Sequence, residues 1–179
     1  MTDSEGREHG GTWGSSEAAA EWVRGAAARV QAFGPATERM LDLADIRSGS
    51  RVLDVGAGAG DQTLAAARRV GPTGFVLATD ISASLLEVTA MSARQADLSN
   101  VGTRVMDAQK LGLESDSFDA AISRFALMLI PDIHKALSEV RRVLRRGGAP
   151  CRSGSSLSSS TRCSASRHGR RSRKRSSSS

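Results

Sequence analysis

Four groups of residues in this 179-residue chain are suited to holding a small polar ligand. A glycine turn at residues 56–60 (GAGAG) follows one apolar run, and Asp80, Asp107 and the pair Ser123 and Arg124 follow three later runs. Glycines let the backbone approach a ligand closely and leave the N–H groups of a following helix pointing at it. Each group alone is also an ordinary turn sequence, since glycine and aspartate are common in turns. Their occurrence after successive apolar runs predicts one shared site.

The two aspartates suit the hydrogen-bond donors of a nucleoside. Asp80 lies about 20 residues beyond the glycines, which is where nucleotide sites place an acid that accepts from a ribose diol. Asp107 can accept from an exocyclic amine such as that of adenine. A dinucleotide fingerprint needs a third glycine where this chain has Asp61, so the spacing disfavours a nicotinamide cofactor.

Alternating strands and helices must position these groups. Because strands that alternate with helices form parallel sheets, the pattern predicts an α/β doubly wound parallel sheet whose strand ends meet at one edge. The predicted strands are residues 51–55, 74–79, 103–106 and 118–123, and the predicted helices are residues 61–70, 82–98 and 132–146.

The helices carry recognisable caps and apolar faces. Ser82 and Asp132 are predicted N-caps, and the last helix is expected to end at Gly147. Its predicted buried stripe consists of Ile133, Leu137, Val140 and Leu144. Two amphipathic helices, residues 17–33 and 35–44, are expected to cover the sheet edge or its ligand crevice. Within this N-terminal part, Trp13 and Trp22 either pack or cover the ligand.

Five ordered motifs together resemble a known family. They are VLDVGAGAGDQT (52–63), ATDIS (78–82), RVMDAQKL (104–111), SFDAAISRFALMLIPD (117–132) and ALSEVRRVLRRGG (136–148). In order and spacing they resemble the class I S-adenosylmethionine-dependent methyltransferases. Within that family they most resemble the branch of the ubiquinone and menaquinone biosynthesis C-methyltransferases, which carry the methyltransferase type 11 domain.

The resemblance implies a Rossmann-like fold, S-adenosyl-L-methionine as cofactor and methyl transfer to a small-molecule acceptor. It leaves open whether the accepting atom is carbon, oxygen or nitrogen. It assigns a cofactor role to each matching position but names no catalytic residue. The methionyl part of the cofactor would be surrounded by Asp54, Gly56, Gly58, Gly60 and Thr63. Asp80 would hold the ribose hydroxyls, and Ile81 would flank the adenine. The amino edge of the adenine would meet Asp107 and Ala108, and Arg124 would line the methyl-transfer pocket.

Composition divides the chain into three parts: an N-terminal helical cover (1–46), the methyltransferase domain (47–148) and a Ser/Arg-rich tail (149–179). The tail holds eight of the 25 Lys and Arg and no acid, so residues 1–148 sum to 17 minus 19, a charge of about −2. Both cysteines lie in the tail, which leaves the other two parts without a Cys-based metal site. A tail with almost no large apolar residue is expected to be disordered.

The tail departs from the family, whose members continue into a fifth buried strand and a hairpin. Residues 149–155 lack apolar side chains, and Pro150 has no N–H to donate. We therefore expect an incomplete sheet of about four strands, from a truncated or frameshifted gene. The fourth strand would then have an unpaired edge, which predicts self-association.

The sequence also bears on the location of the protein and on other functions. The longest apolar run, residues 125–130, is too short to span a membrane, and the residues after Met1 show no secretory signal, which indicates a cytoplasmic protein. The basic tail could bind nucleic acid, but it has no aromatic residue for base stacking. The third alternative is a non-catalytic remnant of a methyltransferase.

Overall fold

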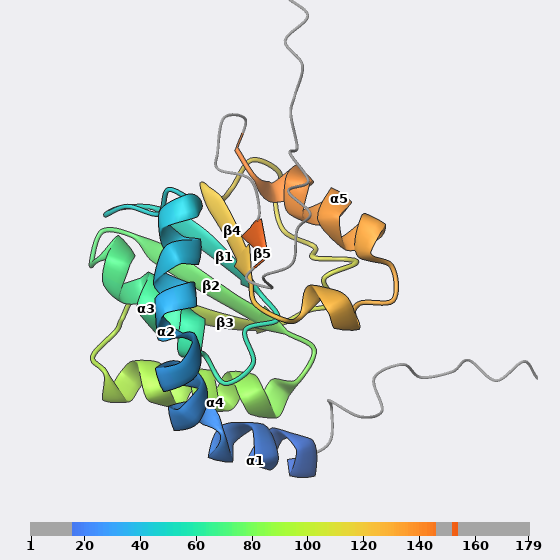
Figure 1. The fold of residues 1–179 in the computed structure, drawn as a ribbon. Helices are drawn as coiled ribbons and strands as arrows, with labels where there is room; N and C mark the ends of the chain where they lie inside the picture. The colour runs from blue at the N-terminus through green and yellow to red at the C-terminus, as the bar shows by residue number, and fades with distance from the viewer. Residues whose placement is uncertain (1–15, 146–151, 154–179) are drawn as a thin grey trace, which may run out of the picture.

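Five parallel strands form one sheet in the order β3-β2-β1-β4-β5 (Figure 1). The computed structural model describes residues 16–145 and 152–153. The strands are β1 Arg51–Val55, β2 Phe75–Asp80, β3 Val101–Val105, β4 Ala120–Ser123 and β5 Arg152–Ser153. The helices are α1 Ser16–Arg24, α2 Ala26–Leu43, α3 Asp61–Val70, α4 Ala83–Gln95, the 3₁₀ turn η1 Leu127–Leu129 and α5 Ile133–Val143. The Rossmann-like doubly wound fold expected from the sequence is confirmed.

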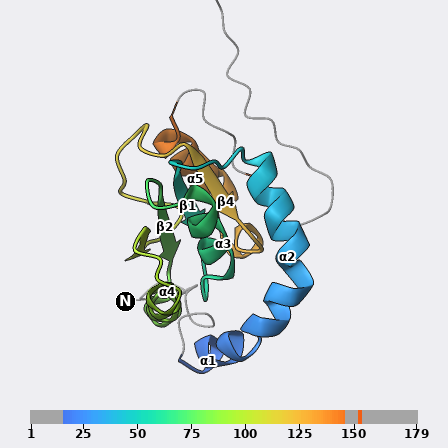
Figure 2. The ribbon, with the colours of Figure 1, turned by 90° about the vertical axis from the view of Figure 1, so that its left-hand side faces the viewer.

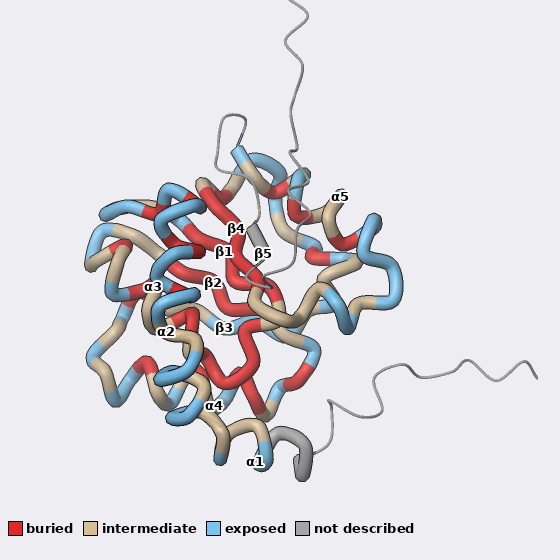
Figure 3. The backbone as a smooth tube through the Cα atoms, in the orientation of Figure 1, coloured by how far each residue is buried: buried red, intermediate tan, exposed pale blue. Residues whose placement is uncertain are grey.

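Alternation along β1 sends its side chains to two cores, one on each face of the sheet. Val52 packs with α2 and α3 residues such as Leu41 and Val70. Leu53 packs on the other face with Val140 of α5. Figure 2 shows the long helix α2 along one flank of the molecule, and Figure 3 shows the buried backbone of β1, β2 and β4 at the centre. The carboxyl ends of these buried strands are therefore held rigidly.

The two N-terminal helices divide at Gly25, not near Pro35 as the sequence suggested. Pro35 lies inside α2, which runs unbroken from Ala26 to Leu43. A proline removes one backbone donor from a helix, and that loss is tolerated here because Met40 and Leu41 anchor the same helix in the core. The predicted boundary was wrong because tertiary packing outweighed the local signal.

Helix α5 buries a face that shares Val140 with the predicted stripe but is rotated away from Ile133. Its buried residues are Ala136, Val140 and Val143, whereas Ile133 is 38% exposed. The helix ends at Val143 because Leu144 adopts an extended conformation and bridges to Phe118. Both predicted N-caps are confirmed: Ser82 accepts a hydrogen bond from the Leu85 N–H and Asp132 accepts one from the Lys135 N–H.

The fourth strand does have a neighbour, contrary to the expectation of an unpaired edge. Arg152 of β5 pairs with Ile122 of β4, and Ser153 pairs with Ser123. Parallel pairing needs backbone groups and not apolar side chains, so a polar segment suffices over two residues. The rest of the predicted tail lies outside the described residues. Among the helices that the structure describes, none is long and apolar enough to cross a membrane.

Candidate functional site

The glycine turn after β1 requires its glycines. Gly56, Gly58 and Gly60 all have positive φ, at 68°, 59° and 89°. A Cβ atom on Gly56 would overlap the Cβ of Ala126, and one on Gly60 would lie 2.8 Å from the Thr89 side chain. Only glycine combines this conformation with such close neighbours. The turn is therefore a largely buried loop of backbone held tightly between α4 and the segment that follows β4.

Asp80 connects the end of β2 to this turn. One carboxylate oxygen accepts a hydrogen bond from the Gly58 N–H and the other accepts one from the Ser82 N–H, both at 2.9 Å. Thr89 of α4 donates to the Gly58 carbonyl at 2.9 Å. The next residue, Ile81, is 49% exposed. The structure thus brings the predicted ribose acid and the glycine turn together.

Asp54 lies beneath the turn, fully buried on β1. It accepts a hydrogen bond from the Thr63 hydroxyl at 2.6 Å and another from the Gln62 amide. Burial, only partly offset by these hydrogen bonds and by the charge of Arg124, raises the pKa of Asp54 to about 7. Thr63 is also fully buried. Both residues therefore face the interior, where they tie the start of α3 to β1.

Asp107 and Ala108 lie on the loop after β3. Asp107 is exposed and accepts hydrogen bonds from the backbone and side chain of Gln109. The loop reaches the site through Met106, whose N–H donates to the Asp80 carbonyl at 2.9 Å. Ala108 packs against the α5 core. This loop is tethered to the end of β2 by its backbone, with the Asp107 carboxylate at its surface.

Arg124, directly after β4, is buried among residues of α2 and α3. Its guanidinium donates to the Thr37 hydroxyl at 2.6 Å and to the Asp61 carboxylate at 3.2 Å. It also lies over the Phe33 ring, 5.7 Å from the centroid. Only 7% of the side chain is exposed. The predicted pocket residue is therefore joined to the glycine turn through the first residue of α3.

Phe125 follows with a backbone conformation that bulky residues seldom adopt. Its φ is +68°, and its ring contacts Phe33 edge-on with centroids 5.0 Å apart. Holding a non-glycine residue there costs of order 1–3 kcal/mol, and such strain collects at functional sites. The strained residue lies between buried Arg124 and Ala126, the residue that touches the glycine turn.

The N-terminal helices contribute site residues that sequence reasoning missed. Arg29 of α2 donates to Asp61 at 3.2 Å, and its guanidinium stacks over the Trp22 ring at 4.1 Å. The Trp22 indole nitrogen lies 2.9 Å from the place where Gly58 would carry a Cβ. Trp22 thus packs against the turn and against Ala59 and Leu85, whereas Trp13 lies outside the described residues. No spacing signal marked Arg29, because its partner Asp61 lies 32 residues away in the sequence.

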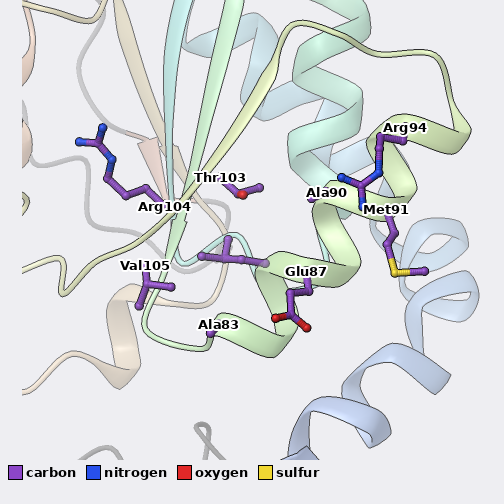
Figure 4. A pocket seen from close by; sticks show the side chains of 9 residues that line it. Ala83, Glu87, Ala90, Met91, Arg94, Thr103, Arg104 and Val105 are labelled. Carbon is purple, nitrogen blue, oxygen red and sulfur yellow. The ribbon is translucent and has the colours of Figure 1, made fainter.

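One hollow in the surface lies away from these residues. It has a volume of about 490 Å³, and Figure 4 shows Glu87 and Met91 of α4 on one side and Thr103 and Val105 of β3 on the other. None of the ten predicted cofactor residues lines it. Met91 and Val105 are both about half exposed there. The hollow belongs to the outer edge of the sheet and not to the strand-end site.

Comparison with known proteins decides the family. The pattern of the methyltransferase domain family matches residues 46–165, which is about two thirds of the chain. The chain belongs to the class I S-adenosylmethionine-dependent methyltransferases. The match begins just before β1, so this methyltransferase domain contains the whole strand-end site except the residues from α1 and α2.

Two curated relatives and one solved structure show the extent of the similarity. Aklanonic acid methyltransferase DauC of Streptomyces sp. (strain C5) is 34% identical over 119 residues, 66% of this chain and 54% of its own length. Demethylmenaquinone methyltransferase of Staphylococcus aureus is 40% identical over 111 residues, 62% of this chain and 45% of its own. The crystal structure of an S-adenosylmethionine-dependent methyltransferase from Aquifex aeolicus superposes with a TM-score of 0.58 at 27% identity, covering 61% and 58% of the two chains. The chain thus spans about half the length of these curated relatives.

Proposed function

We propose that this chain binds S-adenosyl-L-methionine at the strand ends and transfers its methyl group to a small-molecule acceptor. The observation that carries the proposal is the joined arrangement of glycine turn and acid: Gly58 donates to Asp80 at 2.9 Å. This pairing would put an acceptor for ribose hydroxyls beside a backbone that a ligand can approach closely. The match to the methyltransferase domain family supports it.

Unpartnered polar atoms around the turn fit such a ligand. Among the described residues, three buried side-chain polar atoms lack a hydrogen-bond partner: Nη2 of Arg29, Oε1 of Gln62 and Oγ of Ser123. They belong to α2, to the first turn of α3 and to the end of β4, and these elements meet at the glycine turn. Buried polar groups are nearly always paired in native proteins. A polar ligand over the turn would provide partners of the missing kind.

The predicted residues would hold the cofactor in two ways. Asp80 would accept from the ribose hydroxyls, while Ile81, Asp107 and Ala108 would border the adenine. Asp54 and Thr63, being buried and hydrogen-bonded to each other, would shape the turn from below. Gly56, Gly58 and Gly60 would admit the methionyl part, and Arg124 would lie at the pocket where transfer takes place.

The cofactor, when bound, supplies an electrophilic methyl group on a sulfonium, so the chain needs no strong acid or metal of its own for activation. Its residues contribute orientation and water exclusion. Trp22 and Phe125 are apolar groups placed to exclude water over the turn and beside Arg124. The names of the relatives place their acceptors among small molecules, aklanonic acid and demethylmenaquinone. A small-molecule acceptor is accordingly proposed here.

The same proposal gives each of the three parts of the chain a role. Residues 47–148 would bind the cofactor, and residues 1–46 would form the cover. Contacts of Trp22 and Arg29 with the turn and with Asp61 support the assignment of α1 and α2 to a cover. The tail, residues 149–179, would contribute little beyond the two residues of β5.

Calorimetric titration with S-adenosylhomocysteine tests the proposal. Asp80→Asn should weaken binding by roughly 1.5–3 kcal/mol, because charge-assisted hydrogen bonds to the ribose are lost. Asp97→Asn, the same change at an exposed residue of the loop after α4, should leave the affinity unchanged. Absence of binding to the parent protein, or an unaltered affinity in a folded Asp80→Asn variant, would refute the assignment.

A further inference from the structure

Strand β3 forms an open edge of the sheet. It stands at the end of the order β3-β2-β1-β4-β5, and among the described residues no strand pairs with its outer side. The Asn100 C=O and the Met106 N–H are both hydrogen-bonded to β2. Because backbone groups alternate in direction along a strand, those of Val101, Thr103 and Val105 point outward, away from β2. Such an edge is a ready template for another strand.

The hollow between α4 and β3 adds apolar side chains beside this open backbone (Figure 4). Met91 of α4 and Val105 of β3 line it and are 52% and 55% exposed. The small side chains of Ala83 and Ala90 also line it, which leaves room between the helix and the strand. An apolar surface that continues an unpaired strand suits a partner that supplies both a strand and apolar side chains.

The sequence of β3, Val101–Val105, is complementary to itself when two copies run antiparallel. If Thr103 faces its own counterpart across a two-fold axis, Val101 lies opposite Val105. Threonine pairs and apolar pairs across strands are stabilising. In the same register Arg104 lies opposite Gly102, which has no side chain, so the two arginines do not face each other. The outward backbone groups of β3 belong to the residues that would exchange hydrogen bonds in this register.

Helix α4 carries a charge pattern with the same symmetry. Glu87 and Arg94 are exposed, line the hollow and lie on either side of Met91 along the helix. Neither charge has an ion-pair partner among the described residues. A two-fold axis perpendicular to the sheet places both copies of α4 on the same face and antiparallel. Glu87 of each copy would then lie opposite Arg94 of the other, with the Met91 side chains between these pairs.

We infer that this surface, formed by β3 and by Glu87, Met91 and Arg94 of α4, binds a second copy of the chain. The two sheets would join through antiparallel pairing of their β3 strands. The occupant is a second copy because both the side chains of β3 and the charges of α4 are complementary to themselves about one axis. Such a symmetric interface closes after two copies. The inference does not depend on the proposed function.

Charge reversal on α4, followed by sedimentation velocity of the full chain, tests the inference. We expect the parent protein to dimerise, and Glu87→Arg and Arg94→Glu each to raise the dissociation constant at least tenfold, because each reversal places like charges opposite each other. The double variant should dimerise as the parent does, and an equal mixture of the two single variants should form a mixed dimer. Arg141→Glu, at an exposed residue of α5, is the matched control and should dimerise like the parent.

Thr103→Pro tests the strand pairing separately from the charges. Because the Thr103 N–H points outward, proline would remove a donor to the second copy and leave the pairing with β2 intact. We expect a monomer with the circular dichroism spectrum of the parent. A parent protein that sediments only as a monomer would overturn the inference. So would a dimer that persists unchanged in Glu87→Arg and Arg94→Glu, or a mixture of these two variants that stays monomeric.

Discussion

Asp54 shows how one buried side chain can couple the site to the stability of the domain. It lies under the glycine turn with no exposed surface, held by Thr63 and Gln62. Burial disfavours its charged form, and its pKa is accordingly raised to about 7. In the unfolded chain the same group loses its proton near its ordinary value of 3.8. The folded protein therefore binds one more proton than the unfolded chain between these two values.

The raised pKa of Asp54 predicts a stability that falls as pH rises. The contribution of this residue should be most favourable below about pH 4, decline between pH 4 and 7, and level off above pH 7. The total change is on the order of 4 kcal/mol, since each pKa unit corresponds to about 1.4 kcal/mol. Asp54→Asn has no proton to lose, so its denaturant-derived free energy of unfolding should decline less over this range.

The comparison that isolates this effect is the difference between the parent and variant proteins at each pH. Asp116→Asn, at an exposed position, should reproduce the parent curve. A parent–variant difference that stays constant from pH 4 to pH 7 would show that Asp54 is already ionised in the folded protein.

At the scale of elements, helix α5 demonstrates that an apolar pattern can fit more than one face. Ile133, Leu137, Val140 and Leu144 have helical spacing, yet the helix buries Ala136, Val140 and Val143. The neighbouring loop explains the choice, because Leu144 must leave the helix to bridge Phe118.

Replacing Val140 and Ile133 by alanine tests the face that α5 buries. Val140 is 1% exposed and packs against Leu53 and Ala121, so Val140→Ala should cost roughly 1.5–3 kcal/mol of unfolding free energy. Ile133→Ala should cost less than about 1 kcal/mol, although it removes more atoms, because Ile133 is 38% exposed. Urea denaturation measures both values. The reverse order would support the stripe expected from the sequence.

At the scale of the whole molecule, stability comes from two apolar layers on either face of the sheet. One layer joins Leu41, Val52 and Val70, and the other joins Leu53, Leu111 and Phe118. Both layers consist of residues between Met40 and Leu144. The two residues of β5 pair with Ile122 and Ser123 and lie near α2.

A chain ending at Ser153 should therefore unfold much as the full chain does. We expect the midpoint of thermal unfolding to shift by less than about 2 °C, because both apolar layers remain complete and a segment poor in apolar residues buries little surface. S-adenosylhomocysteine affinity should also be retained. Circular dichroism melting and titration of the two chains check this, and a drop of many degrees would mean that residues 154–179 pack onto the domain.

The sequence by itself determined the features that are local. Glycines at 56, 58 and 60 are demanded by the turn's own backbone conformation, and Ser82 and Asp132 cap helices through donors three residues away. The alternation of strands with helices likewise predicted a parallel sheet, because elements in that order can bury their apolar faces in few other arrangements.

Only the tertiary structure decided which distant residues meet. Arg29 reaches Asp61 across 32 positions, and Arg124 reaches it across 63. No spacing rule links such residues, because their approach depends on how α2 lies against α3 and β4. Contacts between elements far apart in the chain also decided three other features. Packing decided that α2 continues through Pro35 and which face of α5 is buried. Backbone pairing with β4 decided the two-residue strand β5.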